Sequence, residues 1–203
     1  MKKKEEAMAE DLIEIRWHGR GGQGAKTAAL LFGEAAIDTG MFIQAFPEYG
    51  PERTGAPIKS FNRLSKKPIR LHSGIINPNI VLVLDPTLLK TVDVLEGLEK
   101  GGILIVNTHK SSKEMREKLS VEPGILVYTL DASKIAMETI GMNKPNTPML
   151  GALARVTHIL DFDKMLESIE RKLKKKFRGK PEEIVSKNME AIKTAHKMTK
   201  GEE

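Results

Sequence analysis

The residues best suited to chemistry in this 203-residue chain form a glycine-rich segment near its start. The segment fits the pattern GxGxxG and reads Gly19-Arg20-Gly21-Gly22-Gln23-Gly24. Glycines at these places let the backbone approach a phosphate, and the free amides and positive dipole at the start of a following helix attract an anion. Arg20 and Lys26 would add positive charge. This segment, called the glycine turn below, predicts an anion site; the alternative is a tight strand-to-helix turn that needs glycine for its backbone alone.

A nicotinamide site needs one more residue type, an acid near the end of the second strand that holds the ribose hydroxyls. Here the second predicted strand ends in Gln44-Ala45-Phe46, with Asp38 before the strand and Glu48 beyond Pro47. Neither carboxylate has the expected position. The sequence therefore argues against a standard dinucleotide site and against a stand-alone dehydrogenase.

The segment 47–57 is the second candidate for binding. Three prolines and two glycines in eleven positions exclude a helix or a central strand and indicate a loop of fixed shape. It leaves the carboxyl end of a strand, where loops of this kind often carry function, and it contains Arg53 and Thr54. We expect it to lie beside the glycine turn and to bind a ligand or another chain. The alternative is a packing loop whose charges pair with each other or with water.

Catalytic residues and metal ligands are not predicted in this chain. The absence of cysteine excludes cysteine-ligated zinc, thiolate-bound iron-sulphur clusters and a cysteine nucleophile. The five histidines lack the spacing of a metal site, and no catalytic triad or acid pair can be assembled. Asp85 followed by Pro86 resembles a catalytic carboxylate after a strand, but a helix cap with proline at the first helical position explains the pair without chemistry.

A basic run lies in the last part of the chain, whose formal net charge is +6. Six cations occupy nine positions: Lys172, Lys174, Lys175, Lys176, Arg178 and Lys180. A nucleic-acid module would need interleaved aromatic residues, and only Phe177 is present. Cations also suit the negative end of a helix dipole. The favoured interpretation is a solvated helix end without nucleic acid, with an acidic protein partner as the alternative.

These candidates require elements that position them. Apolar and charged residues alternate over 12–17 and predict a strand, and an apolar stripe from residue 25 predicts a helix that Gly40 ends. A strand at 41–46 completes a βαβ unit with parallel strands. A short hairpin of 58–64 with 68–71 is predicted next. Further strands are predicted at 80–84, 103–107 and 125–130, and further helices at 87–99, 112–119 and 133–140.

Three helical patterns end the chain, at 149–160, 163–177 and 181–198. The last one should bury Val185, Met189 and Ile192. The predicted fold class is α/β: a three-layer, Rossmann-like, mostly parallel sheet with an inserted hairpin and a helical C-terminal layer over 147–203, in a single domain spanning 1–203 with a frayed N-terminus at 1–11. No apolar run approaches the roughly 18 residues of a membrane span, and no signal-peptide pattern is found, so a cytoplasmic protein without membrane contact is expected.

Three segments together resemble one known family. Residues 18–24, 49–57 and 146–152 look like the gamma subunit of 2-oxoacid:ferredoxin oxidoreductases, in the expected order and spacing. The resemblance covers residues 13–191. Gly55-Ala56-Pro57 stands where the 2-oxoglutarate enzymes more often have Gly-Gly-Thr, which favours the pyruvate synthase branch. Many pyruvate relatives carry a second arginine at the position of Thr54.

The resemblance implies a subunit role in a larger enzyme. Such enzymes decarboxylate a 2-oxoacid on thiamine diphosphate, pass electrons through iron-sulphur clusters to ferredoxin and deliver the acyl group to coenzyme A. The alpha and beta subunits form the thiamine site, a delta subunit carries the clusters, and gamma is a Rossmann-like part beside the coenzyme A path. This chain is then expected to hold no cofactor alone, to be inactive in isolation, and to share coenzyme A through the glycine turn, Arg53 and Thr54. The alternative is a pure scaffold subunit without ligand contact.

Overall fold

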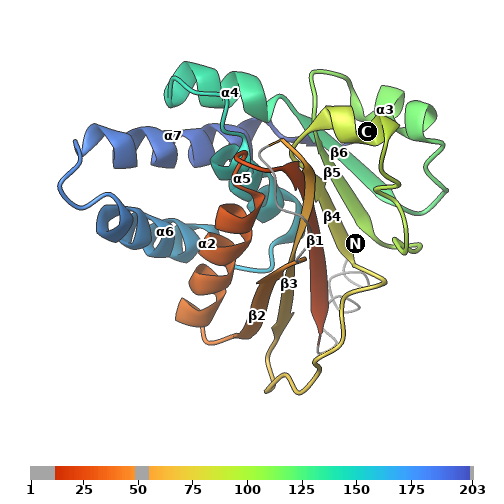
Figure 1. Cartoon of the computed structure of the whole chain (residues 1–203), viewed down its shortest axis with the longest axis horizontal. Coiled ribbons are helices and arrows are strands. Elements are labelled where there is room, and N and C mark those ends of the chain that lie inside the picture. Colours follow the sequence, from red (N-terminus) through yellow and green to blue (C-terminus); the bar gives the residue numbers. More distant parts are fainter. Residues whose placement is uncertain (1–11, 49–54, 202–203) are drawn as a thin grey trace.

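The computed structural model describes residues 12–48 and 55–201, which form a sheet with helices on both faces (Figure 1). The 1–11 segment, Arg53 and Thr54 therefore lie outside the described residues. The seven strands have the order β2-β3-β1-β4-β5-β6-β7. Their bounds are β1 Ile13–Arg20, β2 Phe42–Pro47, β3 Pro57–Ser65, β4 Ile80–Val83, β5 Ile103–Asn107, β6 Leu126–Leu130 and β7 Lys200–Gly201. The four strands β1, β4, β5 and β6 are parallel to their neighbours in this set, which confirms the predicted α/β class.

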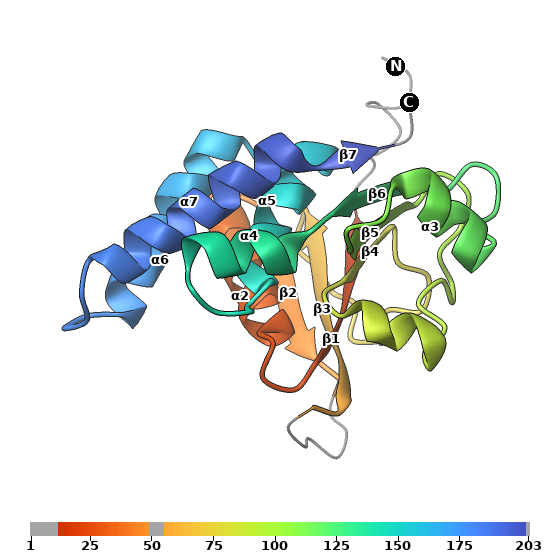
Figure 2. The same ribbon diagram turned by 90° about the horizontal axis from the view of Figure 1, so that it is seen from above.

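The helices form the two outer layers. Their bounds are α2 Ala25–Asp38, α3 Ser112–Leu119, α4 Ala132–Thr139, α5 Asn146–Thr157, α6 Phe162–Lys176 and α7 Glu183–Met198, with a short 3-10 helix, η1, at Pro86–Lys90. Figure 2 shows α2 and α4 to α7 on one side of the sheet, and α3 and η1 on the other. The predicted three layers and helical C-terminal layer are thus confirmed.

The inserted hairpin differs from the predicted one. Residues 68–71 form no strand, and β3 instead pairs antiparallel with β1 on one side and β2 on the other. The prediction of neighbouring β1 and β2 was therefore wrong, because β3 lies between them. The register decides this arrangement: β3 matches β1 over eight residue pairs, which satisfies far more backbone groups than a short hairpin with 68–71 would.

The predicted helix at 87–99 is also wrong, since only η1 forms there. Two features hold the rest of this segment out of a helix. Gly97 has a φ of 71°, and a Cβ on it would lie 2.1 Å from the Ile76 carbonyl oxygen. The buried Arg16 side chain donates hydrogen bonds to the carbonyl oxygens of Val94 and Glu96. These two carbonyls are satisfied by a side chain from the sheet, so neither needs a helical hydrogen-bond partner.

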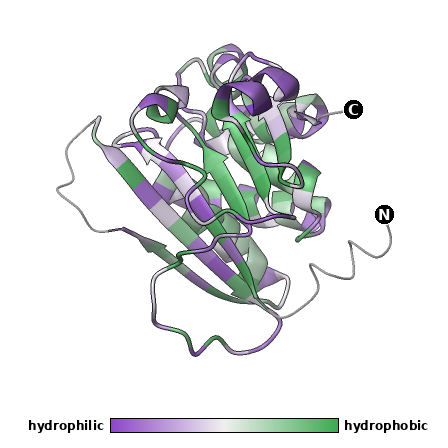
Figure 3. Cartoon of the chain, turned by 90° about the vertical axis from the view of Figure 1, so that its right-hand side faces the viewer, coloured by the Kyte–Doolittle hydropathy of each residue, from purple (hydrophilic) through white to green (hydrophobic). Residues whose placement is uncertain are grey.

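Two hydrophobic clusters lie on the two faces of the sheet. Ile80 and Leu82 of β4 face the cluster under α2 and α5 to α7, whereas Val81 and Val83 face the cluster under α3. Figure 3 shows the hydrophobic central strands beside β2 and β3, which mix hydrophilic and hydrophobic residues. The uniformly apolar strand β4 is buried along its whole length, as a strand covered on both faces is.

The C-terminal helices pack closely where Gly151 of α5 meets α7. A Cβ at Gly151 would lie 2.1 Å from the Ile192 carbonyl oxygen, so only glycine permits this distance. Val185, Met189 and Ile192 of α7 are buried, as predicted. The two-residue strand β7 was not predicted; it pairs antiparallel with Tyr128 and Thr129 of β6. In the described parts of the chain, no helix has the length and apolar character to cross a membrane.

Candidate anion-binding pocket

The glycine turn joins β1 directly to α2. Gly19 and Arg20 are the last residues of β1, and α2 begins one residue after Gly24. Gly22 and Gly24 have φ values of 96° and 86°, so both need glycine for their backbone conformation. The predicted strand-to-helix turn is confirmed, with β1 three residues longer at its end than the sequence suggested.

The start of α2 leaves amide groups open to a ligand. No side chain caps this helix, and its first turn contains no acidic residue. Among the described residues, no acceptor reaches the amides of Ala25, Lys26 and Thr27. Three free donors and the positive end of a 14-residue helix therefore face the same place, which favours an anion.

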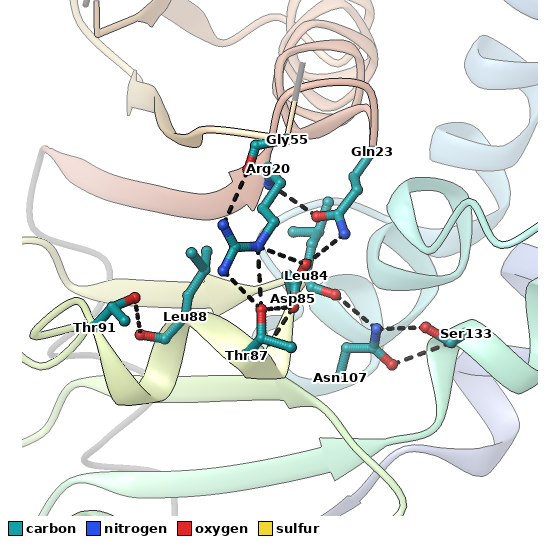
Figure 4. Close-up of polar contacts among 10 residues, drawn as sticks. All are labelled: Arg20, Gln23, Gly55, Leu84, Asp85, Thr87, Leu88, Thr91, Asn107 and Ser133. Carbon is teal, nitrogen blue, oxygen red and sulfur yellow. Dashed lines mark hydrogen bonds and ion pairs between the residues drawn. The ribbon is translucent and has the colours of Figure 1, made fainter. Parts of the chain in front are cut away.

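Arg20 has partners within the chain (Figure 4). Its Nε lies 3.2 Å from Oδ2 of Asp85, its Nη2 donates to Oγ1 of Thr87 at 2.9 Å, and its Nη1 donates to the Gly55 carbonyl oxygen at 3.0 Å. Asp85 also accepts a hydrogen bond of 2.6 Å from Nε2 of Gln23. We call this group of Arg20, Gln23, Asp85 and Thr87 the Asp85 clasp.

The electrostatics of the Asp85 clasp favour a fixed ion pair. Burial opposes ionisation of Asp85, but the hydrogen bonds from Thr87 and Gln23 and the charge of Arg20 outweigh it, so the pKa of Asp85 lies below its ordinary value. Asp85 also caps η1 by accepting from the Thr87 amide, as the sequence predicted. The contact with Arg20 and Gln23 was not foreseen, because these residues lie more than sixty positions away in the chain.

The loop before β3 is attached to the glycine turn by its backbone. Gly21 donates to the Ala56 carbonyl oxygen at 2.9 Å, and Gly55 donates to that of Gly21 at 3.1 Å. The end of the loop thus lies beside the glycine turn, as predicted. The strand that places it there is β3, whose Pro57 pairs with Arg20 of β1, and not a β2 adjacent to β1. The roles predicted for Arg53 and Thr54 stay predictions.

A cavity of about 820 Å³ opens at the glycine turn, between the start of α2, the end of α6 and the start of α7. Gly21, Gly22 and Gly24 line it, whereas Arg20 and Gln23 do not. Its charged lining consists of one glutamate, Glu183, and five lysines: Lys26, Lys144, Lys176, Lys180 and Lys187. Glu183 is paired with Lys187 at 2.5 Å. The positive charge of this pocket therefore comes from lysines rather than from Arg20.

Apolar side chains form a large part of the pocket lining. The larger of them are Leu31, Ile58, Ile140, Met142, Leu173, Phe177 and Ile184. A pocket of this size that combines apolar side chains with cations suits an organic molecule that carries anionic groups.

Part of the basic run belongs to this pocket. Lys174 and Lys175 are exposed, as the predicted solvated helix end requires, and Lys174 pairs with Glu170 at 2.7 Å. Lys176 and Lys180 instead line the pocket together with the glycine turn. The sequence separates these lysines from the glycine turn by some 150 residues, so their spacing gave no sign of a shared site.

Asn146 is a pocket residue that the site prediction missed. It begins α5, is 9% exposed, and lies against the glycine turn: a Cβ on Gly24 would stand 2.8 Å from Cγ of Asn146. Its neighbour Thr147 is buried and donates to Oδ1 of Asn188 at 3.0 Å, and both line the pocket. The motif 146–152 could have pointed to Asn146. In the sequence analysis this motif supported the family resemblance and was not considered as part of the binding site.

His18 lies away from this pocket and is uncharged near neutral pH. Nε of Arg16 donates to Nε2 of His18 at 2.9 Å, and both side chains are buried. Burial, then the charges of Arg16 and Lys59, lower the pKa of His18 to about 3. In the described ranges, no three histidine or acidic side chains gather as metal ligands would.

Comparisons with known proteins decide the family. The family model for pyruvate ferredoxin/flavodoxin oxidoreductase matches residues 14–198. The chain belongs to this family. Among members of the oxidoreductase family, pyruvate synthase subunit PorC of Thermotoga maritima is 46% identical over 194 residues, which cover 95% of this chain and 97% of that protein. The common subunit gamma of the pyruvate/ketoisovalerate oxidoreductases of Pyrococcus abyssi is 48% identical over 188 residues, which cover 93% and 97%.

Solved structures of oxidoreductase subunits have the same fold. The crystal structure of pyruvate oxidoreductase subunit PORC from Thermotoga maritima matches with a TM-score of 0.82 at 42% identity, covering 96% of this chain and all of that one. The 2-oxoglutarate:ferredoxin oxidoreductase of Magnetococcus marinus matches with a TM-score of 0.73 at 19% identity, covering 93% of this chain and 31% of that one. At this identity the second match shows the fold alone.

Proposed function

We propose that this chain is the non-redox gamma subunit of a pyruvate:ferredoxin oxidoreductase complex, which converts pyruvate and coenzyme A to acetyl-CoA, carbon dioxide and reduced ferredoxin. The family match and the similarity to named pyruvate synthase subunits over more than nine-tenths of the chain support this proposal. In it, alpha and beta subunits hold thiamine diphosphate and a delta subunit holds the iron-sulphur clusters. This chain, which has no cysteine, supplies no thiolate ligand for such a cluster.

The chain's own contribution is assembly and a share of the coenzyme A site. The pocket beside the glycine turn carries this part of the proposal, because it combines free amides at the start of α2, five lysines and several apolar side chains. Coenzyme A offers the matching chemistry: a pyrophosphate and a ribose phosphate, joined to an adenine ring and an uncharged pantetheine arm. Helix N-termini and lysines are common ligands of such phosphates.

The Asp85 clasp favours a second candidate function, a scaffold subunit without ligand contact. Arg20, the cation of the glycine turn, is paired with Asp85, and the turn is tied to the loop before β3 by two backbone hydrogen bonds. A turn with these contacts also suits a purely structural role, in which it holds the loop in place at a subunit interface.

Lys26 distinguishes the two functions. It is exposed, is the second residue of α2 and lines the pocket. Lys26→Glu places a carboxylate at the start of a helix, which favours the helix itself but repels an anion in the pocket. In the assembled complex we expect the apparent KM for coenzyme A to rise about tenfold, the loss of one charge-assisted hydrogen bond, with the KM for pyruvate unchanged.

The matched control is Lys113→Glu. Lys113 is the exposed second residue of α3, and it lies outside the pocket. We expect its variant to keep the KM values of the parent complex. If Lys26→Glu assembles with an unchanged KM for coenzyme A, the pocket is not its site and the scaffold function stands.

A further inference from the structure

Strand β2 forms one edge of the sheet, and its outer side is open. It pairs with β3 alone, and Figure 1 shows it at the border of the sheet beside α2. Across this pairing the Glu48 amide donates to the Lys59 carbonyl oxygen. Such bonds alternate along an antiparallel strand, so the amides of Ile43 and Ala45 point away from β3. Among the described residues, no group accepts from these two amides, which leaves them available to a further strand.

The two edges of the sheet differ in their protection against other strands. β7, at the opposite edge, has only two residues, and one of them is Lys200. β2 has six residues, none of which is charged, and the only one that disfavours pairing is Pro47 at its end. Short edge strands and edge lysines are the usual protection, because an unprotected edge pairs with other chains. The edge of β2 therefore has the composition of a strand that another chain covers.

Exposed apolar side chains gather on the α2 side of this edge. Gly33 of α2 lies over Ile43 of β2, since a Cβ on Gly33 would stand 2.6 Å from Cδ1 of Ile43. Leu30 and Ile37 lie on the same face of the helix as Gly33, one turn before it and one turn after it. Their exposed fractions are 45% and 55%. They thus flank the place where the side chains of an added strand would point toward α2.

Cations border the opposite face of the same edge. Side chains alternate along a strand, so Gln44 points away from α2. Its Nε2 donates to the Leu71 carbonyl oxygen at 2.8 Å, which places the segment 66–72 beside β2 on this face. The segment contains no acidic residue. Lys66 and Arg70 in it are exposed, and neither has an ion-pair partner among the described residues.

The acidic side chains near this edge are already paired with cations of this chain: Glu34 with Lys172, Asp38 with Arg171, and Glu48 with Lys59. The charge left at the edge is therefore positive. A second copy of the chain would add the same positive charge and be repelled, whereas an acidic segment would be attracted. Charge thus favours an acidic partner over a second copy.

We propose that the free edge of β2 is a docking site for an extended, acidic segment of a partner subunit, which pairs with β2 as a further strand of the sheet. Along this segment, apolar side chains that contact Leu30 and Ile37 alternate with acidic side chains that contact Lys66 and Arg70. The proposal rests on the subunit role in the proposed function. It is independent of the coenzyme A site, because none of these residues lines the pocket.

Ala45→Pro tests the pairing of the backbones. Proline removes the outward amide of Ala45 and is tolerated on an edge strand, so the variant should keep the unfolding temperature of the parent chain. Its dissociation constant for the purified partner subunits should rise at least about tenfold. Hydrogen exchange on the parent chain is a second readout: assembly should slow exchange at the amides of Ile43 and Ala45 by at least about tenfold. Unchanged exchange at both amides would overturn the proposal, whether or not the variant folds.

Leu30→Glu/Ile37→Glu tests the apolar side of the docking site. Both side chains are exposed, so the variant should fold like the parent chain and bind the partner subunits at least about tenfold more weakly. Met137→Glu/Met198→Glu is the matched control, because these side chains are 52% and 53% exposed and lie on α4 and α7. It should keep the parent affinity. Equal affinities of the α2 variant and the parent would contradict a strand seated against α2.

Lys66→Glu/Arg70→Glu tests the charge of the partner. Binding of the parent chain should weaken as salt is added, because salt screens ion pairs. At low salt the variant should bind at least about tenfold more weakly than the parent, and it should lose most of the salt dependence. Lys113→Glu/Lys118→Glu on α3 is the matched control and should keep both properties. If charge reversal at 66 and 70 leaves the affinity unchanged, the partner segment is not acidic and the proposal is wrong.

The outcomes separate this docking site from the proposed function. If the parent chain joins no oxidoreductase complex, the subunit role fails and the docking site fails with it. If Ala45→Pro and the charge-reversed variant both assemble like the parent, the subunit role stands and the docking site is wrong. If the chain alone forms a dimer that Ala45→Pro abolishes, the edge pairs with a second copy, which also overturns the proposal.

Discussion

Asp85 connects two parts of the chain through single atoms of its carboxylate. Oδ1 accepts from the amide and hydroxyl of Thr87, and Oδ2 accepts from Gln23 and pairs with Arg20. Both oxygens are thus used fully as acceptors. A side chain with one acceptor and one donor cannot replace it, because a donor would face the Gln23 amide group.

The first prediction concerns this carboxylate. Asp85→Asn should lower the free energy of unfolding by about 2 kcal/mol, since hydrogen bonds to charged groups are worth about 1.5–3 kcal/mol and the 90%-buried carboxylate is lost. Asp131→Asn is the control: Asp131 caps α4 through the Lys134 amide alone, and asparagine caps equally well. Urea denaturation of both variants measures the difference. Equal stabilities would show that the Asp85 clasp contributes nothing beyond a helix cap.

The second prediction concerns the pH dependence that His18 brings. Its pKa is about 3 in the folded chain against 6.5 without the fold, so the folded state binds fewer protons over this interval. The free energy of unfolding should therefore fall as the pH drops below 6.5, by up to about 1.4 kcal/mol per pH unit. The cause is the burial of His18 and the nearby charge of Arg16.

His18→Gln isolates this effect, because the glutamine oxygen still accepts from Arg16 but does not titrate. Urea denaturation at pH 7 and pH 5 should show that the parent loses about 2 kcal/mol more than the variant between these values. Carboxylates titrate alike in both proteins and cancel in the comparison. An equal loss in both would mean that His18 does not titrate below its ordinary range.

For individual residues, the sequence predicted contacts between residues close together in the chain and missed contacts between residues far apart in it. The glycine turn and the capping role of Asp85 are decided within a few residues, and the structure confirms both. The contact of Asp85 with Arg20 and that of Asn146 with Gly24 join residues far apart in the chain. No periodicity or spacing encodes such contacts, because they arise from how strand ends and helix starts meet in space.

Elements with a regular pattern were predictable in the same way. The strand Ile103–Asn107 and the helix Ser112–Leu119 have the predicted bounds, because a short apolar run and a capping box are complete local signals. The partner strands of β3 and the irregular segment after η1 could not be predicted in this way. The pairing of β3 depends on which strand edge it meets in the folded chain. The irregular segment depends on hydrogen bonds that the Arg16 side chain donates from β1.

The third prediction tests the contact between two helices. Gly151→Ala should lower the free energy of unfolding by about 1–3 kcal/mol, because its Cβ would stand 2.1 Å from the Ile192 carbonyl oxygen and push α5 from α7. Helix propensity alone predicts the opposite sign, a gain of up to about 1 kcal/mol for alanine over glycine. Thermal and urea denaturation give the sign directly.

Gly74→Ala is the control for this substitution. A Cβ at Gly74 meets no atom within 4 Å, and its backbone is not in the left-handed region. We expect its stability to change by no more than about 0.5 kcal/mol. If Gly151→Ala is equally mild, α5 and α7 adjust to the extra methyl group and their close approach is not essential.

At the scale of the whole molecule, the fourth prediction concerns activity. The purified chain alone should not oxidise pyruvate when thiamine diphosphate, coenzyme A and ferredoxin are supplied, because it contains no cysteine for a cluster and no acid-base pair was found in its sequence. The complex of this chain with its partner subunits should oxidise pyruvate under the same conditions. Ferredoxin reduction, followed by absorbance, measures both. Turnover by the chain free of other subunits would contradict the subunit role.

Helix α7 begins at the pocket and ends at Met198, and only Thr199 separates it from β7, the last strand of the sheet. Its 16 residues form a rod of about 24 Å at 1.5 Å per residue. β7 pairs with Tyr128 and Thr129 of β6 and so holds the end of this rod against the sheet. A tag joined after Gly201 therefore acts on this pairing first, and α7 can shift along its axis only if the hydrogen bonds between β6 and β7 break.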